Sequence, residues 1–200
     1  MKQFSLAHTS IHSATLIATL ALAGFAAAQT SWQIDPAHTS AQFSVKHLGV
    51  STVRGAFTKV SGSAKFDAAD PAKTSLEASI DATSVDTRVD MRDKDLRGPN
   101  FLDVEKYPTI TFHSKHTQSA GEGKLKITGD LTIHGTTKEV VLDVDGPSPA
   151  MKDPWGNQRI GASATTKISR KDFGIVADAG MVGDDLTITI DAELVQAPAK

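Results

Sequence analysis

Residues 31–63 read SWQIDPAHTSAQFSVKHLGVSTVRGAFTKVSGS, and this stretch decides the fold class. Apolar and polar residues alternate over residues 41–47, which is typical of a β-strand with one buried face. The alternation resumes over residues 53–57, so we expect two antiparallel strands around a turn at Leu48-Gly49. Gly55 leaves room inside the second strand, as glycines do where a ligand approaches closely. The face that we expect to point inward on the first strand comprises Ala41, Phe43, Val45 and His47.

Alternation of this kind recurs through most of the chain. Residues 60–66 are one residue out of phase with 53–57, which predicts a β-bulge near Thr58-Lys59. A charged segment, 89–97, ends at Gly98-Pro99 and predicts one short helix. We therefore expect an all-β fold, an eight-stranded antiparallel barrel with one short helical insertion, wide enough for one slender ligand. The later strands are expected over residues 76–82, 110–113, 125–133, 140–144, 160–168 and 186–194.

The N-terminus predicts export from the cytoplasm. Lys2 precedes an apolar run over residues 14–27, and small residues follow at Ala26-Ala27-Ala28. This pattern is typical of a cleaved secretory signal peptide over residues 1–28, because the run is shorter than a membrane span requires. We expect one barrel domain over residues 29–195, a disordered tail over 196–200 and a periplasmic or secreted location.

Composition excludes several classes of function. The chain has no cysteine, which excludes thiol nucleophiles, thiolate metal sites and disulfides. Its formal net charge of −2 and the lack of a basic run argue against a nucleic-acid partner. The segment Gly161–Thr165 lacks the last glycine of a nucleophile elbow. His113 and His116 are expected on opposite faces of a strand, so they cannot readily share a metal ion and we predict no metal site. We also predict no required cofactor and no catalytic residue.

Several short motifs resemble those of one known family, in matching order and spacing. The sequence resembles the YceI-like family, periplasmic polyisoprenoid-binding proteins with a lipocalin-like barrel, over nearly all of the expected mature chain. The motifs are Asp35-Pro36-Ala37-His38-Thr39, Phe43-x-x-x-His47, Val53-x-Gly55-x-Phe57, Leu96-Arg97-Gly98-Pro99-Asn100-Phe101-Leu102-Asp103, Tyr107-Pro108 with Phe112-x-Ser114, Gly129-x-Leu131-Thr132 with Gly135-Thr136-Thr137, and Arg170-x-Asp172-Phe173-Gly174.

The resemblance implies a tunnel that holds a long isoprenoid, a quinone or a similar amphiphile. We expect His47 to form hydrogen bonds inside the barrel or to meet the ligand's polar end, with Asp35 and Arg97 at the mouth. Segments 89–102 and 169–185 are candidate lids. The residues expected to line the tunnel are Phe43, Val45, His47, Phe57, Leu76, Ile80, Phe112, Leu131, Ile133 and Leu142.

The expected function is binding and transport or storage of this lipid, without catalysis. Two alternatives stay open at this point. One is a barrel enzyme acting on a small hydrophobic substrate, with His47 needed for turnover. The other is an envelope scaffold whose core is filled by side chains. Transient membrane contact and a homodimer are also left open.

Overall fold

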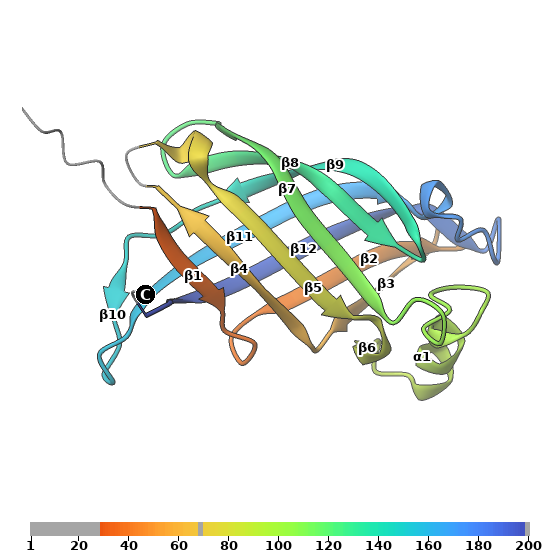
Figure 1. Cartoon of the computed structure of the whole chain (residues 1–200). Coiled ribbons are helices and arrows are strands. Elements are labelled where there is room, and N and C mark those ends of the chain that lie inside the picture. Colours follow the sequence, from red (N-terminus) through yellow and green to blue (C-terminus); the bar gives the residue numbers. More distant parts are fainter. Residues whose placement is uncertain (1–28, 68–69, 199–200) are drawn as a thin grey trace, which may run out of the picture.

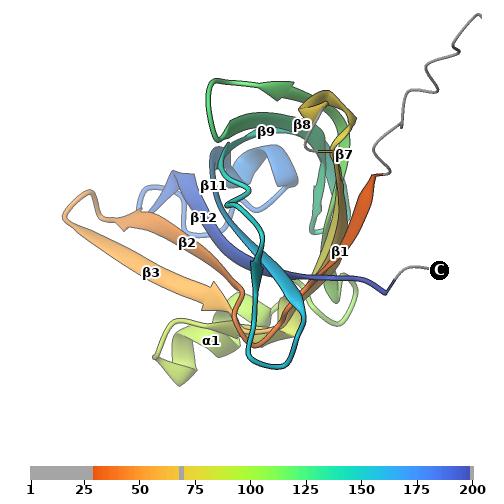
Figure 2. The ribbon, with the colours of Figure 1, turned by 90° about the vertical axis from the view of Figure 1, so that its left-hand side faces the viewer.

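The computed structural model describes residues 29–67 and 70–198 of the chain. Antiparallel strands wrap around one long axis and close on each other (Figure 1, Figure 2). The predicted signal peptide, residues 1–28, lies outside the described residues. The strands are β1 (Thr30–Ile34), β2 (Ser40–His47), β3 (Ser51–Phe57), β4 (Val60–Phe66), β5 (Ser75–Asp81), β6 (Val85–Asp86), β7 (Thr109–Ser119), β8 (Lys124–Ile133), β9 (Thr136–Asp145), β10 (Met151–Lys152), β11 (Gln158–Ser169) and β12 (Val182–Gln196).

The barrel has eight staves, as predicted, because two of them are each built from two short strands. β1 and β2 both pair with β12, and they act as one stave interrupted by the loop 35–39. β3 pairs with β2 while β4 pairs with β1, so these two strands form the next stave. β5, β7, β8, β9 and β11 follow in order, and β11 pairs with β12 over residues 159–169 to close the barrel.

The phase change near Thr58-Lys59 has a different cause from the predicted bulge. These two residues lie in the break between β3 and β4, where the partner strand changes from β2 to β1. The Thr58 amide donates to the Ser84 carbonyl oxygen, and the Lys59 amide donates to Ser84 Oγ. The register shift on β7 lies between Ser114 and His116.

That shift corrects the expectation for two histidines. His113 and His116 were expected on opposite faces because side chains alternate along a regular strand. The irregularity between Ser114 and His116 changes the phase, and both histidines are exposed. On the inward face the alternation resumes at Thr117, which is buried.

One end of the barrel is covered by the predicted helix, α1 (Asp90–Arg97), and by the loop 170–181; we call it the α1 end. Asp93 is the buried residue of α1, and its carboxylate accepts hydrogen bonds from the amide and hydroxyl of Thr87, which is also buried. Within residues 29–67 and 70–198, no helix is long and apolar enough to cross a membrane.

The loop after β11 is ordered by a buried cation. The described residues form three short 3-10 helices: η1 (Pro71–Lys73), η2 (Ala82–Ser84) and η3 (Arg170–Phe173). Arg170, in η3, is 4% exposed, and its guanidinium donates to the carbonyl oxygens of Gly183, Ile175, Ala177 and Val182. These hydrogen bonds tie segment 169–185, the candidate lid, to the start of β12, which begins within it at Val182.

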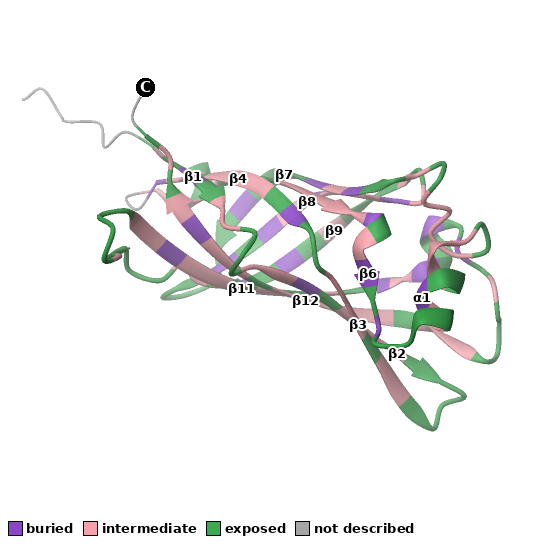
Figure 3. Cartoon of the chain, turned by 90° about the horizontal axis from the view of Figure 1, so that it is seen from below, coloured by how far each residue is buried: buried purple, intermediate pink, exposed green. Residues whose placement is uncertain are grey.

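Two sequence-based expectations need correction: the position of His47 and the end of the last strand. The β2–β3 hairpin projects away from the barrel, and its tip is exposed (Figure 2, Figure 3). His47 lies at that tip, paired with Ser51, and is exposed rather than inside the barrel. At the other terminus, β12 extends to Gln196, one residue past the expected end of the barrel domain, and the Ala197 amide donates to the Ser31 carbonyl oxygen.

Candidate ligand-binding cavity

A cavity of about 190 Å³, which we call cavity 1, extends along the barrel interior. Every stave contributes inward-facing apolar side chains to it, because period-2 alternation places one face of each strand inside. Small residues such as Ala41, Ala78 and Ala164 occur among them and leave the interior incompletely filled. None of the described residues that line cavity 1 carries a charge.

A second cavity of about 110 Å³, cavity 2, lies at the α1 end. It is bounded by Leu96, Phe101, Leu102 and Phe173 from the segments that cover this end. Cavities 1 and 2 have five lining residues in common, so they are neighbouring parts of one apolar interior. The shared residues are Phe43, Phe57, Ile110, Ile133 and Ile188.

Most of the residues predicted to line a tunnel meet in this interior. Val45 lines cavity 2 alone, while eight others line cavity 1: Phe43, Phe57, Leu76, Ile80, Phe112, Leu131, Ile133 and Leu142. His47 lines neither cavity, because β2 has left the barrel wall at that point. Alternation along a strand does not show where that strand leaves its barrel.

Asp35 and Arg97, predicted as polar contacts at one mouth, lie apart and line neither cavity. Arg97 donates from Nε to the Thr83 carbonyl oxygen at 2.8 Å and from Nη2 to the Val85 carbonyl oxygen at 2.7 Å. These bonds fix α1 to the neighbouring backbone at the α1 end. Asp35 lies in the β1–β2 loop and takes part in an ion-pair network with β11 and β12.

Sequence reasoning missed the centre of that network, Arg159. Its Nη1 donates to Asp35 Oδ2 at 2.7 Å and to Glu193 Oε1 at 2.5 Å, and its Nε donates to Asp153 Oδ2 at 2.8 Å. The three carboxylates come from three separate loops and strands. No short motif could reveal this arrangement, because Asp35 and Arg159 are 124 residues apart.

Hydrogen bonds in the network shift the pKa values of its members. His38 and Arg159, with the Ala37 amide, lower the pKa of Asp35 to about 2, and Asp35 in turn raises the pKa of His38. Burial alone would raise the pKa of Asp153, but bonds from Arg159 and Asn157 outweigh it and lower that pKa. The carboxylates of Asp35 and Asp153 therefore stay ionised through the neutral pH range.

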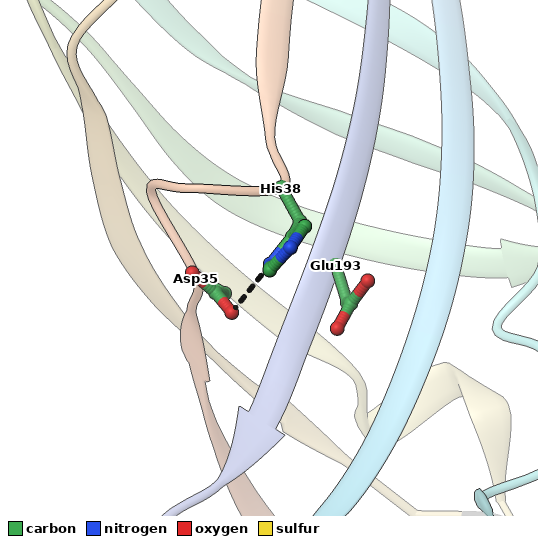
Figure 4. A group of neighbouring side chains, drawn as sticks. All are labelled: Asp35, His38 and Glu193. Carbon is green, nitrogen blue, oxygen red and sulfur yellow. Dashed lines mark hydrogen bonds and ion pairs between the residues drawn. The ribbon is translucent and has the colours of Figure 1, made fainter. Parts of the chain in front are cut away.

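Three of these side chains have the composition of a metal site. Ligand atoms of Asp35, His38 and Glu193 all lie within 4.8 Å of one another (Figure 4). Both carboxylates already accept hydrogen bonds from Arg159, so a cation would have to compete with a guanidinium. The group is accounted for as an ion-pair network that joins the β1–β2 loop to β11 and β12.

Aromatic rings cover two strand glycines in the barrel wall. Gly55 lies opposite Phe43 on β2, and a Cβ there would come within 2.5 Å of the Phe43 ring. A Cβ at Gly129 would come equally close to the Phe112 ring. The room that Gly55 was expected to leave is thus occupied by a side chain of the protein itself.

Comparisons with known proteins agree with this architecture. The model of the YceI-like domain matches residues 32–194. Protein YceI of Escherichia coli is 38% identical over 181 residues, 90% of this chain and 94% of the relative, and a UPF0312 protein of Vibrio cholerae is 42% identical over 76% of this chain and 80% of the relative.

Solved structures show the same barrel. The crystal structure of Burkholderia cenocepacia BcnA has a TM-score of 0.71 and 27% identity, covering 80% of this chain and 98% of that one. A polyisoprenoid-binding domain from Saccharophagus degradans has a TM-score of 0.62 over 84% of this chain and 99% of that one; at 15% identity, it is a likeness of fold. With a family model matched over most of its length and relatives of this identity, the chain belongs to the YceI-like family.

Proposed function

We propose that this protein holds one isoprenoid-type lipid inside the barrel and transports or stores it in the periplasm. The observation that carries the proposal is the mainly apolar lining that runs through cavities 1 and 2, with no charged residue in the described lining of cavity 1. An interior filled by side chains, as in the scaffold alternative, would leave no such volume. The family, and the fold shared with a domain described as polyisoprenoid-binding, support the same class of ligand.

The size of the interior limits the ligand. Each of the two cavities, at about 190 and 110 Å³, is smaller than the roughly 300–1,000 Å³ usual for ligand pockets, and only together do they reach the lower limit of that range. A thin, flexible chain suits this volume better than a fused-ring compound. Longer chains require large side chains such as Phe43 and Phe112 to change rotamer, because these rings line cavity 1 and lie against glycines in the wall.

Burial of the tail gives ample affinity from water but little preference over a membrane. Each buried CH₂ group contributes about 0.8 kcal/mol, so ~20 tail carbons contribute roughly 16 kcal/mol before the costs of binding. A bilayer offers the same apolar surroundings, so selectivity must come from the shape of the interior and from the ligand's polar end. A carrier with these properties can exchange its lipid with a membrane instead of trapping it.

The periplasmic location rests on the N-terminal pattern and on the family. Residues 1–28 have the three parts of a secretory signal peptide, and the family resembled by this sequence is periplasmic. Fractionation of cells that express the full chain tests this part of the proposal. Mature protein starting near Gln29 in the periplasmic fraction is expected, and retention of the intact N-terminus in the cytoplasm would contradict it.

Filling the interior tests the binding proposal directly. Ala164 lines cavity 1 on β11, whereas the adjacent Thr165 is exposed on the outer face, so Ala164→Phe and Thr165→Phe form a matched pair. We expect native mass spectrometry to show a stoichiometric lipid on the wild-type protein and on Thr165→Phe, and none on Ala164→Phe. Urea unfolding verifies that both variants are folded. Equal lipid retention by the two variants would contradict binding inside the barrel.

A further inference from the structure

Two buried polar atoms stand out because they lack hydrogen-bond partners. Among the residues that the structure describes, Trp32 Nε1 and Thr74 Oγ1 are the buried side-chain nitrogen and oxygen atoms without a partner. An unpaired buried polar group costs about 1–3 kcal/mol, so each such group requires an explanation. Trp32 is 4% exposed, so bulk water does not reach its ring.

Both atoms lie at the same end of the interior, opposite the α1 end; we call it the Trp32 end. Thr74 lines cavity 1 and directly precedes β5, whose Leu76 pairs with Ala64. Ala64 pairs in turn with Trp32 on β1. Trp32 packs against Ile160 and Leu194, which also line cavity 1.

The polar groups at the α1 end are already in use. Arg170 lines cavity 2, but its guanidinium donates to four backbone carbonyl oxygens. Arg97 donates to two more. A ligand's polar end placed there would meet Phe101, Leu102 and Phe173, with no free donor among these groups. The two ends of the interior therefore differ in what they offer a ligand.

We propose that the bound lipid lies with its polar end at the Trp32 end, and that this polar end is an uncharged hydrogen-bond acceptor such as the carbonyl of a quinone, ester or amide. This inference rests on the proposed function and adds the orientation and the chemical class of the ligand. The Thr74 hydroxyl lies in the lining of cavity 1 and can donate, so an acceptor on the ligand satisfies it. The Trp32 N–H, which can only donate, lies among residues packed against this lining and marks the same end.

The absence of charge from the described lining of cavity 1 decides between carbonyl and phosphate. A phosphate moved into this lining would lose its hydration without gaining a cation, which is far more costly than burying a carbonyl. Arg159, a cation at this end, lies outside the cavity lining and donates to three carboxylates. A lipid with a phosphate end is therefore disfavoured relative to a neutral one.

Thr74→Val tests the first step because it replaces the hydroxyl with a methyl group of similar size. If Thr74 Oγ1 is unpaired, this change raises the Tm of the lipid-free protein. The matched control is Thr117→Val: Thr117 is buried, and its hydroxyl donates to the Thr74 carbonyl oxygen at 2.9 Å, so its loss lowers the Tm. A fall in Tm for Thr74→Val would show that its hydroxyl is paired and overturn the inference.

Binding measurements test orientation and class. The probes are a prenyl quinone, the prenyl phosphate with the same tail and the corresponding hydrocarbon without a polar end, each titrated into lipid-free protein. We expect Thr74→Val to weaken quinone binding about tenfold, the value of one hydrogen bond, and to leave hydrocarbon binding unchanged. Thr165→Val makes the same change on the exposed outer face of β11 and should have no effect. Thr166→Val, in the lining of cavity 1 and close to Ile168 of cavity 2, reports a polar end that lies toward the α1 end instead.

Each other result has a definite meaning. Weaker quinone binding in Thr166→Val instead of Thr74→Val would reverse the orientation, and tighter binding of the phosphate than of the quinone would overturn the chemical class. Equal quinone binding by wild type and Thr74→Val would remove the proposed contact. Failure of all three probes, including the hydrocarbon, would contradict the proposed function itself and is thereby distinguished from failure of this inference.

Discussion

The two ends of the barrel are each held by one arginine with several partners, but the partners differ in kind. At the α1 end, Arg170 is 4% exposed and donates to four backbone carbonyl oxygens, with a single carboxylate, that of Asp184, 3.5 Å away. At the Trp32 end, the Arg159 side chain is 18% exposed and binds three carboxylates. The first arrangement fixes the path of a loop, whereas the second joins side chains that water and salt can reach.

This difference separates the roles of the two ends. A buried cation bonded to backbone cannot be released without leaving several polar groups unsatisfied, so the α1 end should open rarely. The ion pairs at the Trp32 end compete with solvent and depend on the charge of Asp35 and His38. If lipid enters the barrel at one end, the Trp32 end requires the smaller rearrangement.

The largest effect is predicted for Arg170→Met. The substitution keeps an unbranched apolar stem but removes every donor to the loop 175–183, so we expect a loss of about 3–5 kcal/mol in the free energy of unfolding. Arg170→Lys should recover only part of this loss, because an ammonium group cannot reach four carbonyl oxygens in the same plane. Urea unfolding of the lipid-free protein measures both variants.

Lys171→Met is the control for this prediction, since Lys171 is adjacent and, like Arg170, is paired with Asp184. Its side chain is 47% exposed, so the change should cost less than about 0.5 kcal/mol. Similar losses for Arg170→Met and Lys171→Met would show that the loop is held by charge rather than by its backbone contacts, and the contrast between the ends would disappear.

An intermediate effect is predicted for a single methyl group at the α1 end. In Gly55→Ala, the new Cβ would lie 2.5 Å from the Phe43 ring and 2.7 Å from Thr87 Cγ2, so we expect a loss of about 1–3 kcal/mol from overpacking. Gly161→Ala at the Trp32 end is the matched change, because its Cβ would meet its nearest atom at 3.8 Å.

Denaturant unfolding of these two glycine variants compares packing at the two ends. Gly161→Ala should leave the free energy of unfolding unchanged or raise it, since alanine reduces the entropy of the unfolded chain. Adding Phe43→Leu should recover part of the loss in Gly55→Ala if the ring is the obstacle. Equal losses in the two glycine variants would mean that the α1 end is no more tightly packed than the Trp32 end.

The sequence predicts the staves well because a barrel imposes one simple rule on each strand. Side chains at Phe43, Leu76 and Phe112 alternate with polar neighbours, and this alternation places them inside wherever the strand belongs to the wall. The rule fails where geometry changes locally. His47 lies beyond the wall, and the irregularity in β7 turns His116 to the same side as His113.

The polar features of the two ends could not be predicted in the same way. Arg170 binds main-chain oxygens, which every residue possesses, so its partners have no signature in the sequence. Arg159 meets Asp35 across most of the chain length. Trp32 and Thr74 are ordinary residues in strand-like segments, and only the three-dimensional structure shows that they lack partners.

Acid should weaken the Trp32 end selectively. The pKa of Asp35 is lowered from 3.8 to about 2, so its ion pairs stabilise the fold above about pH 4, and this stabilisation is lost as the pH falls through the pKa of about 2. Asp35→Asn should therefore lower the Tm at neutral pH. The difference in Tm between this variant and the wild type should become smaller as the pH falls. A difference in Tm that does not change between neutral pH and about pH 2 would contradict this assignment.

The smallest effect is predicted for His38, at the same end. Asp35 raises the pKa of His38 above 6.5, so the pair stabilises the fold fully below pH 6.5 and loses this contribution as the pH rises through the raised pKa. The His38 side chain is 60% exposed, so solvent screens the pair and the shift in Tm should be small. The measurement compares His38→Gln with wild type on both sides of that range, and His113→Gln on the exposed face of β7 serves as the control. A Tm of His38→Gln that is lower than wild type at acidic pH alone would show that the Trp32 end responds to pH through two groups of opposite sign, Asp35 at low pH and His38 near neutrality. A shift in Tm of the same size in His113→Gln would instead show that the effect comes from general surface charge.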